Sequence, residues 1–281
     1  MSCEANPGDI DQALADNYLR LGVNRVSLGA QSFRDATLRR LNRCHSEKDI
    51  SDSFHILRKA GFRNISLDLI LSLPGETLED VQRSLRELLK LNPEHVSLYE
   101  LTIEEKTVFG DLHKKGKLKL PNEDLQIEML TLARETLKKV GYDHYELLSY
   151  AKPGFRSRHN RIYWANQEYL GLGPGAFSYL DGRRFRNSSS YTEYLKKINE
   201  NDWSAFEEEK LDREKKDTES FLLSLRLKEG ARAARFRSLM KRSNKNLKTL
   251  EEKGLIEKKN GTIRLTGRGQ FFAETVFTEL S

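Results

Sequence analysis

Residues 64–103, NISLDLILSLPGETLEDVQRSLRELLKLNPEHVSLYELTI, contain two extended apolar segments separated by a clearly delimited helix. The segments 64–71 and 95–103 are rich in aliphatic residues, which is typical of buried strands. Between them, Thr77 is placed to cap a helix that carries acidic residues in its first turn and ends at Asn92-Pro93. This order predicts a strand–helix–strand unit with parallel strands.

The same alternation continues toward the N-terminus. Further strands are expected at SCEAN and VNRVSLGA, and helices at IDQALADNYLRL, DATLRRLN and KDISDSFHILRKAG, the last ending at Gly61. The predicted fold is therefore α/β with a parallel sheet, either doubly wound or a barrel. Because the chain starts inside a strand, we expect it to be part of a larger sheet.

Toward the C-terminus the pattern changes. A polar connector is expected over 105–120, followed by a helix over 122–141 and a strand over 142–150. Beyond about residue 200, charged helices surround a hairpin signal at Asn260-Gly261, which suggests a winged-helix-like module. The predicted division is a partial barrel, a packing segment with a connector helix and strand, and a C-terminal domain, at residues 1–110, 111–205 and 206–281.

The composition restricts the class of protein. With 37% hydrophobic and 32% charged residues over 281 positions, the chain is expected to be soluble with a substantial core. The first residues show no signal-peptide pattern, which predicts a cytoplasmic location. The net charge of +6 is modest for this length. Cys3 and Cys44 match no disulfide framework and no metal-binding spacing.

Four polar side chains lie where predicted strands meet their loops. Glu4 is in the first strand, Gln31 follows the second, and Arg43 lies in a break between two helices. Asp68 is surrounded by aliphatic residues, so it must be either paired or functional. Ligands of α/β sheets bind at the carboxyl ends of the strands. Two carboxylates, an amide and a guanidinium there suit a zwitterionic ligand with hydroxyl groups.

The segments GVNRVSLGAQSF, RLNRCH, ISLDLILSLPGETLEDVQRSL, HVSLYELTIEEKT and YELLSYAKPGFRSRHNRIYW together resemble the radical SAM coproporphyrinogen III oxidase-like family. Within it, the chain is most similar to the HemW branch of heme chaperones. The similarity extends from residue 1 to about 180 and continues more weakly through the C-terminal module. It implies a partial radical SAM (β/α) barrel followed by a HemN-type C-terminal domain.

The resemblance also implies roles for individual residues. S-adenosylmethionine (SAM) would contact Glu4, Gln31, Arg43 and Asp68, with Thr102 as a weaker candidate. The H-N-x-x-Y-W motif implies heme binding by His159, Asn160, Tyr163 and Trp164, with His159 as the axial ligand of the heme iron. Imidazole is a standard heme-iron ligand, and aromatic neighbours can cover a porphyrin face. The implied partners are heme and heme-accepting client proteins, including ones at a membrane surface.

The chain departs from the family in one respect. The C-x3-C-x2-C motif that holds a [4Fe–4S] cluster is absent, as is the glycine-rich SAM segment. Cys3 and Cys44 cannot replace three closely placed thiolates. We therefore expect no radical catalysis from this chain, and we expect a fragment beginning at an internal methionine rather than a natural short form.

Two other functions are compatible with parts of the sequence. An oxygen-independent coproporphyrinogen III oxidase would share the SAM residues, although the HNRIYW segment fits the chaperone branch better. A winged-helix nucleic-acid binder would use the basic residues Lys241, Arg242, Lys245, Lys248, Lys258 and Lys259. Such a cluster is more often a solvated helix face, so nucleic acid is not the expected partner. Gly171, Gly173 and Gly175 lack the Lys-Ser/Thr of a phosphate loop and predict close backbone approach.

Overall fold

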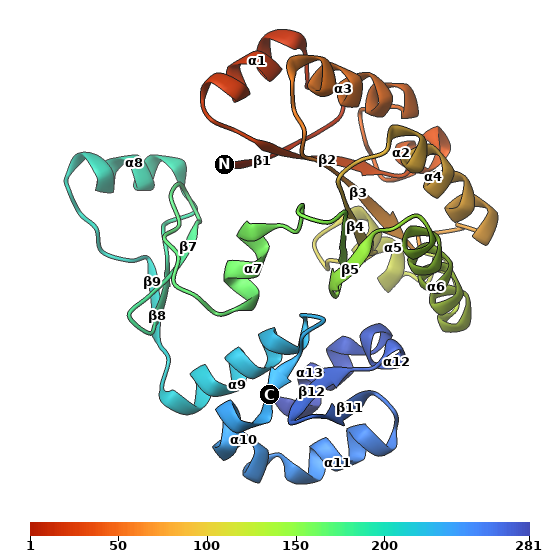
Figure 1. Ribbon diagram of the computed structural model, residues 1–281. Coiled ribbons are helices and arrows are strands. Elements are labelled where there is room, and N and C mark those ends of the chain that lie inside the picture. Colours follow the sequence, from red (N-terminus) through yellow and green to blue (C-terminus); the bar gives the residue numbers. More distant parts are fainter. The chain divides into compact units, whose positions relative to one another are not determined.

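The computed structural model describes residues 1–281, which form two compact units, Met1–Arg156 and Ser157–Ser281 (Figure 1). The finer predicted division at residues 110 and 205 stays a prediction.

The first unit contains a six-stranded sheet in the order β1-β2-β3-β4-β6-β5. The strands are β1 Ser2–Ala5, β2 Arg25–Gln31, β3 Ile65–Leu71, β4 His95–Glu100, β5 Asp143–Glu146 and β6 Ser149–Ala151. The first four pair in parallel, and β6 and β5 add antiparallel strands at one edge. The predicted α/β fold with a parallel sheet is confirmed.

Six helices belong to this unit: α1 Gln12–Arg20, α2 Asp35–Arg40, α3 Glu47–Ala60, α4 Leu78–Leu91, α5 Val108–Lys114 and α6 Glu123–Lys139. Thr77 caps α4 as predicted, because its side chain accepts from the Asp80 backbone N–H in a reciprocal capping box. Gly61 and Asn92 end α3 and α4 in the left-handed conformation that a helix C-terminus favours.

The two faces of the sheet differ in chemistry. Alternate strand residues, such as Val26, Leu28, Leu67 and Val96, join one hydrophobic core with residues of α1, α3, α4 and α6. Since neighbouring side chains of a strand point to opposite faces, the residues between them line the other side. On β2, β3 and β4 that side carries Arg25, Ser27, Ser66, Asp68, His95, Ser97 and Tyr99. We call this side the polar face.

Two local predictions in this unit were wrong. Residues 142–150 are not one strand but the hairpin β5–β6, because the chain reverses at Leu147-Leu148. The expected connector over 105–120 contains the short helix α5, whose N-cap Thr107 accepts from the Gly110 N–H. Gly110 is required there, because a Cβ atom would lie 2.3 Å from the carbonyl oxygen of Glu104.

The second unit begins with α7 Arg158–Trp164 and a three-stranded antiparallel sheet. Its strands are β7 Phe177–Leu180, β8 Arg183–Arg186 and β9 Glu207–Lys210, with α8 Tyr191–Asn199 between β8 and β9. The predicted close approach of backbone segments occurs at Gly171, where a Cβ atom would lie 2.1 Å from the Phe177 carbonyl oxygen. Gly173, with open space around it, instead adopts a positive φ of 105°.

The C-terminal part has the predicted winged-helix-like arrangement. Five α-helices and a 3-10 turn accompany a three-stranded sheet in the order β10-β12-β11, and the turn at Asn260-Gly261 joins β11 to β12 as expected. Its elements are α9 Arg213–Leu225, β10 Ala231–Arg232, the 3-10 turn Ala233–Phe236, α10 Arg237–Arg242, α11 Asn244–Glu252, β11 Ile256–Lys259, β12 Thr262–Leu265, α12 Gly267–Phe271 and α13 Ala273–Leu280. None of the chain's helices has the length and apolar character needed to span a bilayer.

Candidate functional site

Three of the expected SAM contacts lie on the polar face, on three neighbouring strands. Glu4 is exposed near the end of β1 and pairs in register with Ser27, while Cys3 and Ala5 beside it pack against the hydrophobic core. Asp68 lies in the middle of β3, two strands away from β1. Parallel pairing therefore places both carboxylates on the same side of the sheet.

Gln31 ends β2 at a break in the sheet. The pairing of β2 with β3 shifts between Leu28 and Gln31, and Gln31 has a left-handed φ of 62°. Its amide folds back over Gly29, where a Cβ atom would lie 2.7 Å from Nε2 of Gln31. Gly29 shares the polar face with Ser27, so the irregular strand end directs the Gln31 amide to that face.

Asp68 is held by hydroxyl groups rather than by a direct ion pair. Ser27 donates to both carboxylate oxygens at 3.1 and 3.2 Å, and Ser66 donates at 3.2 Å. Burial raises the pKa of Asp68 above its usual value, while the hydroxyls of Ser97 and Ser27 and the charge of Arg25 act in the opposite direction. The acid inside an aliphatic strand is thus paired, as its surroundings required.

The remaining two SAM candidates come together at the ends of β3 and β4. Arg43, between α2 and α3, and Thr102, just after β4, both line an open cavity of about 610 Å³. Ile70, two residues beyond Asp68 on the polar face, is also in its wall. Arg39 and Arg40 add positive charge, so an anionic group is favoured there.

A layer of buried residues on the polar face was not predicted from the sequence. Ser27, Ser66, Ser97 and His95 are all less than a tenth exposed and lie beside Asp68 along β2, β3 and β4. The sequence feature that indicates this layer is a serine that alternates with aliphatic residues in RVSLG, ISLDL and HVSLY. Another missed residue is His45 of the RLNRCH segment, whose Nε2 lies 3.3 Å from the Ala30 carbonyl oxygen and ties the loop to the end of β2.

The residues present do not fit an iron–sulfur cluster. Cys3 lies against the hydrophobic core, and Cys44 is exposed in the loop that contains Arg43. No three His, Cys, Asp or Glu side chains in residues 1–281 gather closely enough to hold a metal ion. A [4Fe–4S] cluster needs three or four closely placed thiolates, so the cysteines of residues 1–281 cannot hold one.

The four heme candidates all lie on one short helix, α7, in the second unit. His159 is exposed, its ring nitrogens make no hydrogen bond, and its ring meets Tyr163 edge-on with centroids 4.9 Å apart. Asn160 is half-buried, and its backbone N–H is capped by Ser157. Unlike the exposed His159 ring, the Trp164 ring is covered by a side chain, the Arg226 guanidinium, which lies 4.3 Å from the ring centroid. His159 and Tyr163 are therefore the better placed of the four.

An exposed apolar surface lies further along the same unit. Tyr163 contacts Tyr169 edge-on at 4.6 Å, and the next apolar residues, Leu170 and Leu172, are exposed. These two leucines and Trp203 line a cavity of about 240 Å³. Leu172 is 79% exposed and Trp203 75% exposed, so this surface offers aromatic and aliphatic contact area that the unit itself does not use.

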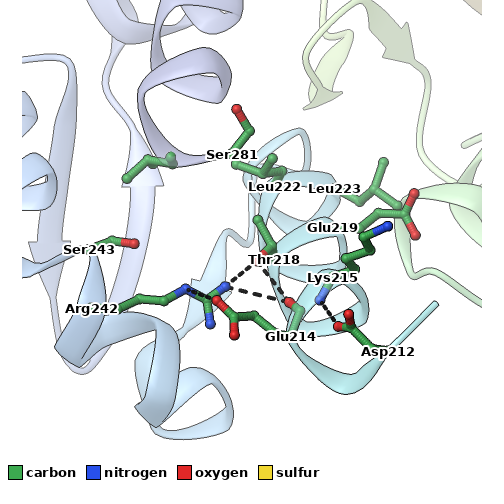
Figure 2. A pocket seen from close by; sticks show the side chains of 11 residues that line it. Asp212, Glu214, Lys215, Thr218, Glu219, Leu222, Leu223, Arg242, Ser243 and Ser281 are labelled. Carbon is green, nitrogen blue, oxygen red and sulfur yellow. Dashed lines mark hydrogen bonds and ion pairs between the residues drawn. The ribbon is translucent and has the colours of Figure 1, made fainter.

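The C-terminal module has a further open cavity, of about 730 Å³, beside α9 (Figure 2). Arg242 does not project freely from it, because its guanidinium contacts Glu214 at 3.2 Å and the hydroxyl of Thr218. Lys258 likewise pairs with Glu251 at 2.9 Å. Two of the six basic residues considered for nucleic-acid binding are thus engaged with carboxylates of the same module.

Comparisons with known proteins agree with this architecture. A model of the radical SAM superfamily matches residues 1–88, and a model of the HemN C-terminal domain matches residues 211–272. The heme chaperone HemW of Lactococcus lactis subsp. lactis is 38% identical over 279 residues, covering 98% of this chain and 73% of the relative. The chain belongs to the HemW family. HemW of Bacillus subtilis is 37% identical, covering 98% of this chain and 74% of the relative.

A solved structure extends the likeness to the fold of the whole chain. The radical SAM enzyme coproporphyrinogen III oxidase (HemN) of Escherichia coli superposes with a TM-score of 0.81 over 99% of this chain and 69% of its own, at 21% identity. At that identity the match supports the fold alone. The expected radical SAM relationship, the HemN-type C-terminal domain and the place in the HemW family are confirmed.

Proposed function

We propose that this chain is a heme chaperone, which binds heme through His159 and passes it to client proteins. The observation that carries the proposal is the exposed His159 ring on α7, whose nitrogens have no partner in the protein and which lies edge-on to Tyr163. A neutral imidazole nitrogen is a good ligand for heme iron. The identity of more than a third with relatives named heme chaperone HemW supports it.

The surroundings of α7 suit an extended aromatic ligand. Tyr163 and Tyr169 offer ring edges, and exposed Leu170, Leu172 and Trp203 lie in the same unit. A porphyrin is large, flat and mostly apolar, so its transfer from water to such a surface is favourable. Client proteins would then receive the heme from a site that stays open to solvent.

The test is a titration of the purified protein with heme, followed by the Soret absorption. We expect His159→Ala to weaken binding about tenfold or more, corresponding to about 1.4 kcal/mol or more, because the iron loses its axial ligand. His113→Ala is the matched control, since His113 is also an exposed histidine on a short helix. Absence of heme binding by the wild type, or equal binding by both variants, would contradict the proposal.

We also propose that the rim of the first unit binds SAM through Glu4, Gln31, Arg43, Asp68 and Thr102. The support is that Arg43 and Thr102 line one cavity, whose wall includes Ile70 of the polar face on which the carboxylates of Glu4 and Asp68 lie. A guanidinium suits the ligand's carboxylate, and the acidic side chains suit its ammonium and ribose hydroxyls. Calorimetric titration with SAM should show weaker binding to Arg43→Ala than to Arg20→Ala, which changes an exposed arginine on α1.

A cytoplasmic location is inferred from the two free cysteines, which a reducing compartment preserves. Fractionation of cells that produce the protein would test it, and recovery in an oxidising compartment would contradict it.

A further inference from the structure

Five side chains, four of them buried and Asp68 partly buried, form a continuous chain of hydrogen bonds along the polar face. The hydroxyl of Tyr145 on β5 lies 2.8 Å from Nε2 of His95, and Nδ1 of His95 lies 2.8 Å from Oγ of Ser66. Ser66 reaches Asp68 at 3.2 Å, and Ser27 reaches it at 3.1 Å. The chain of contacts thus connects the antiparallel edge of the sheet to the carboxylate at its centre.

The donor and acceptor roles along this chain are determined by the single hydrogen of each hydroxyl. If Ser66 donates to the Asp68 carboxylate, its oxygen must accept from His95, so the proton of His95 is on Nδ1. Nε2 of His95 is then an acceptor and takes the Tyr145 hydroxyl hydrogen. Only a neutral ring can do both, and burial lowers the pKa of His95 to about 3.

Arg25 offers a competing arrangement, in which Nδ1 of His95 is an acceptor. Its Nη2 lies 3.4 Å from Nδ1 of His95, against 2.8 Å for Ser66. If Nδ1 accepted from Arg25 and from Ser66, the Ser66 hydroxyl would be turned away from Asp68. That would remove one of the hydroxyl donors of the desolvated Asp68 carboxylate, which is costly, so the arrangement in which His95 donates is favoured.

We propose that His95 is a positioning residue of the candidate ligand site, which directs the Ser66 hydroxyl at Asp68 and keeps the carboxylate an oriented acceptor for a ligand's hydroxyl or ammonium group. The proposal rests on the SAM rim proposed above. His95 touches no ligand in this scheme, because Ser66 lies between it and Asp68. Without the His95 donor, the Ser66 hydroxyl is free to rotate away and the carboxylate loses one stabilising bond.

Other ionisable groups face the same layer and act on the carboxylate. Arg25 on β2 favours the charged form of Asp68 and disfavours protonation of His95. Tyr99 on β4 has a pKa raised by burial, with further contributions from the charges of Asp68, Glu146 on β5 and Glu4 on β1. None of these side chains replaces the hydrogen bond to Ser66, so the effect of His95 is separable from theirs.

The decisive measurement is nuclear magnetic resonance on the whole chain. In the wild type, the ¹⁵N shifts of His95 should show a neutral ring protonated on Nδ1 from pH 5 to 8. The ¹³C titration of the Asp68 carboxyl group should move up by about one pH unit in His95→Leu and in Ser66→Ala. His95→Gln, which can both donate and accept, should restore the wild-type midpoint. A ring protonated on Nε2, or an Asp68 midpoint unchanged in both variants, would overturn the inference.

A SAM titration of the same proteins separates the two proposals. We expect His95→Leu to weaken SAM binding several-fold at neutral pH and His95→Gln to restore it. If the wild type binds no SAM, the rim proposal fails, while the tautomer and the carboxyl titration still decide the role of His95. If SAM binds equally to the wild type and His95→Leu, the positioning role fails and the rim proposal stands.

Discussion

Arg58 and Glu94 tie the end of α3 to the beginnings of β3 and β4. Nη2 of Arg58 lies 2.6 and 2.7 Å from the two oxygens of Glu94, and one of those oxygens also accepts from the Ile65 backbone N–H at 3.0 Å. The second Nη of Arg58 donates to the Phe62 carbonyl oxygen at 3.0 Å. One carboxylate therefore organises the entry to two central strands.

Replacing Glu94 by Ala should lower the free energy of unfolding by about 2–4 kcal/mol, because it leaves the partly buried Arg58 guanidinium and the Ile65 N–H without their acceptor. Glu87→Ala is the control, since Glu87 pairs with an exposed Lys90 and should cost less than about 1 kcal/mol. Chemical denaturation measures both. Equal losses for the two variants would contradict this account.

Glu76 should make the fold less stable at alkaline pH. Burial raises its pKa from 4.5 to about 7, although its carboxyl group accepts from the Leu73 backbone N–H at 3.1 Å. Between those values the folded chain holds a proton that the unfolded chain has lost, so stability falls as pH rises through that window. Glu76→Gln should flatten the dependence and add about 1–3 kcal/mol at pH 8, measured by denaturation at several pH values. A wild-type stability independent of pH from 5 to 8, or a variant with the same slope, would count against it.

His95 should contribute the opposite dependence in acid. Its pKa is lowered from 6.5 to about 3, so between these values the unfolded chain binds a proton that the folded chain excludes. Stability is therefore lost as pH falls from 6.5 toward 3, by up to about 1.4 kcal/mol per pH unit. In His95→Gln the loss over pH 6 to 4 should be smaller than in the wild type. Identical acid limbs in denaturation curves would show that His95 is not buried in the neutral form.

Gly269 should be essential to the C-terminal module. A Cβ atom there would lie 1.7 Å from the carbonyl oxygen of Leu255, which belongs to the backbone and cannot move aside. We expect Gly269→Ala to cost about 3 kcal/mol or more, because the clash displaces α12 from the chain before β11. Gly182→Ala should cost only about 1 kcal/mol, since that position has a positive φ of 71° but open space. Thermal unfolding that ranks the two the other way would contradict the prediction.

The sequence was informative wherever one periodicity ran through a whole element. The four parallel strands and the helix from Leu78 to Leu91 follow from aliphatic runs and matching caps, and each lies within a few residues of its expected place. The helix over Arg158–Trp164 was not expected, because seven residues with three aromatic or imidazole rings show no apolar stripe. The reversal at Leu147-Leu148 was missed because neither residue is a turn former.

The candidate site was only partly readable in advance. Strand ends identified Glu4 and Gln31, since carboxyl ends of parallel strands share one edge, and aliphatic neighbours identified Asp68. The link from Asp68 to His95 could not be read, because it depends on how β3 and β4 are aligned, with Ser66 opposite His95. A strand register is set by the packing of a whole face and leaves no local mark in either segment.

The alternation along β3 has a consequence for folding itself. A shift of β3 by one residue against its neighbouring strands would turn Ser66 and Asp68 toward the hydrophobic core beneath the helices. The same shift would place Leu67 on the polar face. Burying a carboxylate without its hydroxyl partners costs several kcal/mol, so misaligned sheets are rejected early. The polar residues of this face therefore also select the correct strand register as the sheet forms. A variant with aliphatic residues on this face would be expected to lose both this selection of register and the polar groups of the ligand site.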